Sequence, residues 1–181
     1  EIAEGLTLST AEVEGVERFL PHLSDVVVGH VVEREKHPDA DKLSYCKVDV
    51  GGPEILGIVC GASNVAAGQK VAVARVGTKL PGDFVIKKAK IRGVESQGMI
   101  CSERELELSD DHAGIWVLAG TPALGTSVAA ALGADDHVIE IDNKSLTHRP
   151  DCWGHRGIAR EIAAIRGRKL LPLDLALPKT E

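Results

Sequence analysis

The chain is poor in aromatic side chains, which make up 3% of its 181 residues. Two tryptophans, two phenylalanines and one tyrosine are too few for a protein that binds single-stranded RNA mainly by stacking bases on aromatic rings. Long apolar runs are also missing. No stretch approaches the roughly 18 residues of a membrane-spanning helix, and no cationic segment leads into an apolar one as in a secretion signal. We therefore expect no membrane partner.

Cysteine is scarce and dispersed. No two of the four cysteines form a C-x-x-C pair, which argues against a zinc ribbon; they are Cys46, Cys60, Cys101 and Cys152. Three of them lie in apolar runs and are typical of small buried side chains. This usage predicts a reducing, cytoplasmic compartment. The sequence also lacks a Walker A loop, a dinucleotide fingerprint and a G-x-S-x-G elbow, so we expect no catalytic residue among the usual phosphate-binding or hydrolase motifs.

Positive charge is not in excess overall, because the net charge is −6. Residues 69–92 nevertheless carry seven cations against one anion, and residues 93–114 carry six anions against Arg104. On a closed barrel, this pattern predicts a basic side and an acidic side. The basic side could follow phosphates, or its lysines could simply protect exposed strand edges from pairing.

Short β-strands separated by glycine turns dominate residues 26–118. Residues 43–50 alternate, which places Leu43, Tyr45, Lys47 and Asp49 on one face and Ser44, Cys46, Val48 and Val50 on the other. Further strands are predicted at 26–32, 54–60, 71–76, 86–92 and 98–101, with 115–118 as a closing segment. Ser102 and Glu105 have the spacing of a capping box. About five strands, spaced roughly ten residues apart, predict a small β-barrel or sandwich.

The flanking segments have a different character. Residues 126–133 predict a short helix, residues 137–142 a strand, and residues 151–166 a helix with Asp151 as its N-cap and Gly167 after its C-terminus. We expect a mainly β protein in which a barrel is inserted into a small α+β domain. Its predicted parts are an N-terminal lead-in at 1–24, the barrel at 25–134 and a C-terminal part at 135–181.

Two other constellations suggest chemistry but have simpler explanations. Acidic residues flank the turn at 37–41, where turn formation explains Asp39 and Asp41 better than acid–base catalysis does. His148, Cys152 and His155 have a spacing that could suggest a metal site. Helical spacing leaves His148 outside the helix, however, and structural zinc normally needs four ligands. We therefore expect no metal site.

Three motifs, taken in order, resemble the tRNA-binding OB-fold domain of the EMAP type. Residues 37–51 match the pattern H-P-x-A-D-K-L-x-x-x-x-V-D-x-G, residues 58–65 match the next element, and residues 90–102 match K-I-R-G-x-x-S-x-G-M-x-C-S. The residues that carry the resemblance are His37, Pro38, Asp41, Leu43, Asn64, Gly93, Ser96, Gly98, Met99 and Ser102. The resemblance implies a five-stranded barrel that binds tRNA, with Lys42, Lys87, Lys88, Lys90 and Arg92 as candidate RNA contacts.

The flanking segments resemble the N-terminal region of the β subunits of bacterial phenylalanyl-tRNA synthetases. Residues 139–164 are similar to the segment that follows the barrel in that family, although residues 147–150 read T-H-R-P where T-P-N-R is commoner. Five residues of this tail are expected to be structural: Arg149, Asp151, Arg156, Gly157 and Glu161. The resemblance implies a non-catalytic fragment of a ligase that attaches phenylalanine to its tRNA.

Several partners follow from this resemblance. It implies tRNA and a synthetase α subunit in an α2β2 assembly, with ATP and magnesium used by the whole enzyme and no cofactor in this fragment; no DNA binding is expected. One alternative is a stand-alone tRNA-binding or chaperone-like protein, which would have no use for residues 139–167. Another is a protein-docking module in which the lysines bind no RNA.

Overall fold

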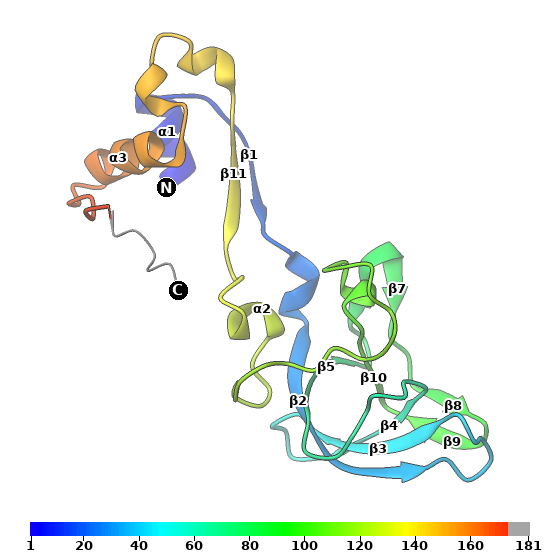
Figure 1. The fold of residues 1–181 in the computed structure, drawn as a ribbon. Helices are drawn as coiled ribbons and strands as arrows, with labels where there is room; N and C mark the ends of the chain where they lie inside the picture. The colour runs from blue at the N-terminus through cyan, green and yellow to red at the C-terminus, as the bar shows by residue number, and fades with distance from the viewer. Residues whose placement is uncertain (174–181) are drawn as a thin grey trace, which may run out of the picture. The chain divides into compact units, whose positions relative to one another are not determined.

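The computed structural model describes residues 1–173 and forms two compact units. One unit comprises residues 18–136, and the other combines residues 1–17 with the chain from residue 137 onward (Figure 1). The predicted boundaries at residues 24 and 134 are not tested by this division and stay a prediction. The last eight residues of the predicted C-terminal part, 174–181, lie outside the described residues.

The larger unit is built on a five-stranded antiparallel sheet. Its strands follow the order β10-β5-β2-β3-β4, with β2 at Val26–Lys36, β3 at Ser44–Asp49, β4 at Leu56–Cys60, β5 at Lys70–Arg75 and β10 at Gly98–Ile100. The long central strand β2 serves two neighbours. Its first half pairs with β5 and its second half with β3, and the register with β3 shifts between Val31 and Glu33. Such a bulge bends a strand and lets the sheet coil.

The two edge strands of this sheet are joined by polar contacts, so the barrel is nearly closed. Gln97 N donates to Gly57 O at 2.8 Å, and Gly57 N donates to the Gln97 side chain at 3.0 Å. Ser96 Oγ accepts a hydrogen bond from Val59 N at 3.1 Å and donates to Gly98 O at 3.0 Å. The predicted fold class is therefore confirmed: the protein is mainly β, with a five-stranded OB-like barrel.

Strand alternation places the barrel core as predicted for residues 43–50. Ser44, Cys46, Val48 and Val50 are buried, whereas Lys47 on the opposite face is exposed. All four cysteines are buried and free. Burial raises the pKa of the Cys46 thiol to about 11 and that of Cys101 to about 12, so neither is a ready nucleophile.

Smaller elements decorate the barrel. They are β6 (Lys79–Leu80), β7 (Phe84–Val85), β8 (Ala89–Ile91), β9 (Val94–Ser96) and helix α2 (Val128–Ala131), capped by Ser127. The expected capping box is present, since Ser102 N donates to Glu105 Oε2 at 2.6 Å and Glu105 N donates to Ser102 Oγ at 3.3 Å. Residues 115–118 join the sheet through an isolated bridge between Val71 and Val117.

The smaller unit joins two distant stretches of chain. Helix α1 (Ile2–Ser9) packs on helix α3 (His155–Ile165), and strand β1 (Val13–Arg18) pairs with strand β11 (His137–Ile141). Helix α1 approaches α3 so closely that a Cβ on Gly5 would lie 2.8 Å from Ile165. Among the described residues, no helix combines the length and apolarity needed to cross a membrane.

The predicted start of the last helix was wrong. Asp151 lies in a 3₁₀ turn, Pro150–Cys152, and α3 begins only at His155, with Gly154 as its N-cap. The Asp151 carboxylate is held by arginines instead of by the backbone of the helix. The backbone carbonyl of Asp151 also packs against Gly157, where a Cβ would collide with it. Gly167 follows the helix at a φ of 60°, as predicted.

Candidate nucleic-acid interface

A two-residue hairpin presents two of the predicted RNA contacts. Strands β8 and β9 pair with Ile91 opposite Val94, so Arg92 and Gly93 form the turn. Both turn residues have positive φ, 47° and 86°, which is the backbone shape that matches the twist of a tight hairpin. Lys90 and Arg92 are exposed. The local sequence thus projects two cations from the tip of a short ribbon.

A buried histidine fixes this hairpin to the turn between β2 and β3. The His37 side chain is 2% exposed, and its Nδ1 accepts a hydrogen bond from Asp39 N at 3.1 Å. Nε2 must then carry the proton, and it donates to Ile91 O at 3.1 Å. A Cβ on Gly93 would lie 3.8 Å from the Asp39 carboxylate, so the two turns are neighbours. His37 is therefore an anchor that holds the basic hairpin in place.

The basic strand predicted at residues 86–92 is only partly correct. Ile86 exchanges hydrogen bonds with Gly77 and Thr78, and strand β8 begins at Ala89. Lys87 and Lys88 consequently lie outside any strand. The segment changes its pairing partner at this point, and periodicity alone does not reveal such a change.

The predicted cations differ in their availability for phosphate. Lys88 forms an ion pair with Glu95 at 2.8 Å. Within residues 1–173, the other four predicted contacts form no ion pair, and all are exposed; they are Lys42, Lys87, Lys90 and Arg92. These four side chains can meet an anion without first losing a carboxylate partner.

The remaining motif residues support the scaffold. Asn64 exchanges two hydrogen bonds of 2.9 Å with the backbone of Ile115, and exposed Asp41 pairs with Lys36 at 2.6 Å. Pro38 is exposed in the turn, and Leu43 is half-buried beyond it. A Cβ on Gly98 would lie 2.9 Å from Ala74 O, so this position needs glycine, while the neighbouring Met99 packs on the core.

Two hollows lie on the barrel, and the larger one borders the basic hairpin. The larger, about 760 Å³, is lined by parts of β4, β8 and β10 and by residues from 102 to 115, and it includes Lys87 and Arg104. The smaller, about 530 Å³, includes Arg34, Lys36 and Lys42. Both are lined by residues 61–63, where they meet. No local sequence pattern points to Arg34, Lys36 or Arg104 as lining residues of these hollows.

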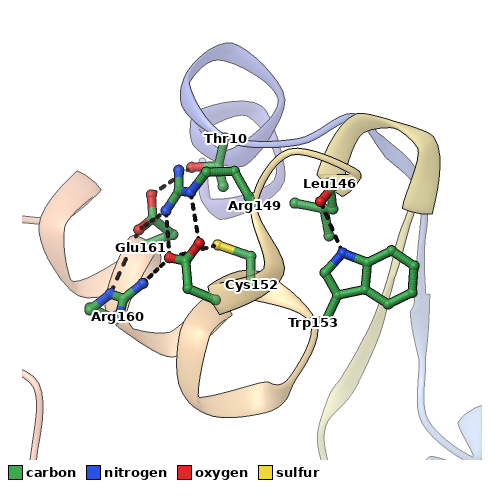
Figure 2. Close-up of polar contacts among 8 residues, drawn as sticks. Thr10, Leu146, Arg149, Cys152, Trp153, Arg160 and Glu161 are labelled. Atoms are coloured by element: carbon green, nitrogen blue, oxygen red, sulfur yellow. Dashed lines mark hydrogen bonds and ion pairs between the residues drawn. The ribbon is translucent and has the colours of Figure 1, made fainter.

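In the smaller unit, the tail residues form a network around one guanidinium (Figure 2). Arg149 donates to both carboxylate oxygens of Asp151, at 3.0 and 2.9 Å, and to Glu161 at 2.8 Å. Thr10 donates to Glu161 at 3.2 Å, and Arg160 contacts Asp151 from α3. The hydrogen bonds from Arg149 lower the pKa of both carboxyl groups, and the two carboxylates raise the pKa of the guanidinium.

The set of possible metal ligands in this network differs from the set that the sequence suggested, and two of its members are held by arginine. Of the described residues, one group of three possible ligands lies close together, Asp151, Cys152 and Glu161, and it includes neither His148 nor His155. Both carboxylates are already bound by arginine, and burial raises the pKa of the Cys152 thiol. Elsewhere in this unit, Arg156 donates to Leu171 O at 2.7 Å and ties α3 to the chain that follows it.

Comparison with known families identifies the barrel. The family model described as "Putative tRNA binding domain" matches residues 26–127, which span the five-stranded sheet and its decorations. The chain belongs to this tRNA-binding domain family.

Sequence similarity to individual relatives extends beyond the barrel to nearly the whole chain. The chain is 52% identical to the phenylalanine–tRNA ligase β subunit of Nitratidesulfovibrio vulgaris, over 97% of this chain and 21% of the relative. It is 48% identical to the same subunit of Burkholderia lata, over 100% of this chain and 23% of the relative. The chain thus spans about a fifth of the length of these relatives. A MetRS-related protein from Pyrococcus horikoshii aligns with 25% identity and a TM-score of 0.43, over 57% of this chain and 87% of that one.

Proposed function

We propose that this chain is the N-terminal region of a phenylalanine–tRNA ligase β subunit and that its barrel provides auxiliary tRNA binding. The observation that carries the proposal is about 50% identity to such subunits over nearly the whole chain, including the segment after the barrel. A stand-alone tRNA-binding protein would give no reason for similarity in residues 139–167. The fragment itself would be non-catalytic.

The wider assignment follows from the same relatives. The whole enzyme would attach phenylalanine to its tRNA with ATP and magnesium, in the cytoplasm, together with an α subunit in an α2β2 assembly. No residue of this chain is assigned to bind phenylalanine, ATP, magnesium or the α subunit. The contribution of the barrel is proposed to be a contact with tRNA phosphates through Lys42, Lys87, Lys90 and Arg92, with a smaller part for the ion-paired Lys88.

The salt dependence of tRNA binding tests this contact. Each phosphate contact at a duplex region steepens the fall of log affinity with log salt by about 0.9. We expect the combined change Lys87→Ala, Lys90→Ala and Arg92→Ala to weaken binding and to flatten the slope by up to about three times that value. The measurement is fluorescence anisotropy of labelled tRNA with the chain at several salt concentrations.

A matched control is Lys144→Ala, which removes one exposed cation from the smaller unit. It should leave both affinity and slope unchanged. An unchanged slope in the triple variant would refute the phosphate contact. If the wild-type chain bound no tRNA at low salt, the protein-docking module would become the better explanation.

A further inference from the structure

The larger hollow on the barrel has a partly apolar lining, which a purely electrostatic RNA contact does not require. This lining includes apolar side chains from several elements: Phe84, Ile86, Ala89, Ile91, Met99 and Ile100. Phe84 is 58% exposed, although burying a phenylalanine ring normally favours folding. The lining therefore offers an apolar surface with an exposed aromatic ring beside the basic hairpin.

The charged residues that line this hollow are suited to the phosphate of a nucleotide. Lys87 and Arg104 line it, and among the described residues neither forms an ion pair. The one acidic residue in the lining is Glu105, and its carboxylate already accepts hydrogen bonds from Ser102 N and Oγ at 2.6 and 2.9 Å. Lys87 and Arg104 outnumber this one carboxylate, so the lining carries a net positive formal charge, which is complementary to phosphate.

His112 adds a group that can contact a base edge. Its Nδ1 lies 3.2 Å from Asp110 O, and because a carbonyl only accepts, Nδ1 must be the donor. In the neutral ring, Nε2 is then an acceptor, and His112 is one of the residues that line the hollow. An acceptor at this place can receive a hydrogen bond from the exocyclic amino group of a base.

From these features we propose that the larger hollow holds an unpaired base of the bound RNA, stacked on Phe84. The proposal rests on the proposed tRNA binding and specifies its substrate as a single-stranded segment. Phosphates of the same segment continue across residues 61–63 into the smaller hollow, where Arg34, Lys36 and Lys42 outnumber Asp41. Stacking of one base requires only one exposed aromatic ring, so the low aromatic content of the chain is compatible with this site.

The test compares two RNAs that differ only in an unpaired end. One is a hairpin with a single-stranded 3′ overhang, and the other is the same hairpin with a blunt end. Binding of each to the full chain is measured by fluorescence anisotropy at fixed low salt. We expect the wild-type chain to prefer the overhang, and Phe84→Ala to weaken overhang binding roughly tenfold while leaving blunt-end binding unchanged. Phe84→Tyr keeps the ring and should retain the preference.

Phe19→Ala is the matched control, because it removes the other phenylalanine of the barrel unit, which is 44% exposed and lies outside both hollows. It should bind both RNAs as the wild type does. Equal binding of the two RNAs by the wild type, or an equal loss with Phe84→Ala, would overturn the base site and leave phosphate-directed tRNA binding intact. Failure of the wild type to bind tRNA or either hairpin would overturn both proposals.

Discussion

At the scale of single residues, hydrogen bonds explain motif positions that charge and periodicity leave undecided. In the sequence, His37 is only one position of a family pattern, whereas the structure gives both of its ring nitrogens hydrogen-bond partners. Its Nδ1 accepts a hydrogen bond from Asp39 N at the start of the β2–β3 turn, and its Nε2–H donates to Ile91 O at the end of β8. The residue that supports the basic hairpin thus comes from a turn more than 50 positions earlier in the chain.

We predict that His37→Ala lowers the free energy of unfolding by about 1–3 kcal/mol, because it removes a buried ring and two hydrogen bonds. Urea unfolding measures this loss. In hydrogen exchange, the variant should exchange faster than the wild type in the β8–β9 hairpin, and this increase should be larger there than in β5. The control is His112→Ala, which removes an exposed ring and should leave stability and hairpin exchange unchanged. Uniform exchange changes across the barrel would contradict a local anchoring role.

At the scale of secondary-structure elements, the alternation of apolar and polar residues predicts strand faces correctly, whereas capping rules fail to predict the start of α3. The buried face of β3 was predicted because a strand with one face in the core alternates strictly. The predicted start of α3 is wrong because an Asp before a helical pattern suggests an N-cap, whereas this carboxylate is bound by the guanidinium of Arg149. The predicted strand at 86–92 wrongly includes Lys87 and Lys88. Ile86 pairs with Gly77 and Thr78, whereas β8 pairs with β9, and this change of partner leaves no periodic signature in the sequence.

The seam of the barrel provides a prediction at this scale. Ser96 is 3% exposed and binds the backbone of both Val59 in β4 and Gly98 in β10. Ser96→Ala leaves Val59 N–H without its acceptor, so we expect a loss of about 1–3 kcal/mol in the free energy of unfolding. Ser63→Ala, at an exposed position near the end of β4, is the control and should cost almost nothing. Equal stability of the two variants in urea unfolding would show that the seam does not depend on this hydroxyl.

At the scale of the whole molecule, the sequence predicts the fold class better than the candidate interface. The barrel follows from strand spacing and the three ordered motifs, which are local properties of the chain. The two hollows bring together Arg34, residues 61–63, Lys87 and Arg104, and this grouping depends on how β2 bends and where the barrel closes. A count of aromatic residues likewise could not show that Phe84 is exposed beside cations.

The smaller unit also depends on long-range contacts, because its two chain segments are separated by the whole barrel unit. Thr10 belongs to the first segment and donates to Glu161 of the second, which Arg149 in turn binds, so this carboxylate joins the two. The stability of this unit should therefore depend on the charge state of its carboxylates. Both carboxylates bound by Arg149 have a lowered pKa in the folded protein.

A carboxyl group with a lowered folded pKa contributes stability above its unfolded pKa, and this contribution is lost as the pH falls through the folded pKa. The ordinary pKa values are 3.8 for Asp151 and 4.5 for Glu161. We therefore predict that the contribution of this network to the free energy of unfolding is constant from pH 7 to about 5 and declines below about 4.5. The decline should be modest, because the side chains are 39% and 20% exposed and solvent screens them.

Denaturant unfolding between pH 7 and pH 3 measures this decline through Trp153, whose indole donates to Leu146 O within the same unit. A Trp116→Phe background removes the other tryptophan signal. Asp151→Asn is the matched variant: it should be less stable at pH 7 and should show a smaller decline, because it no longer titrates at this position. The difference between the two profiles cancels the other carboxylates of the protein. If the profiles were parallel down to pH 3, the ionised Asp151 carboxylate would not contribute to the stability of the smaller unit.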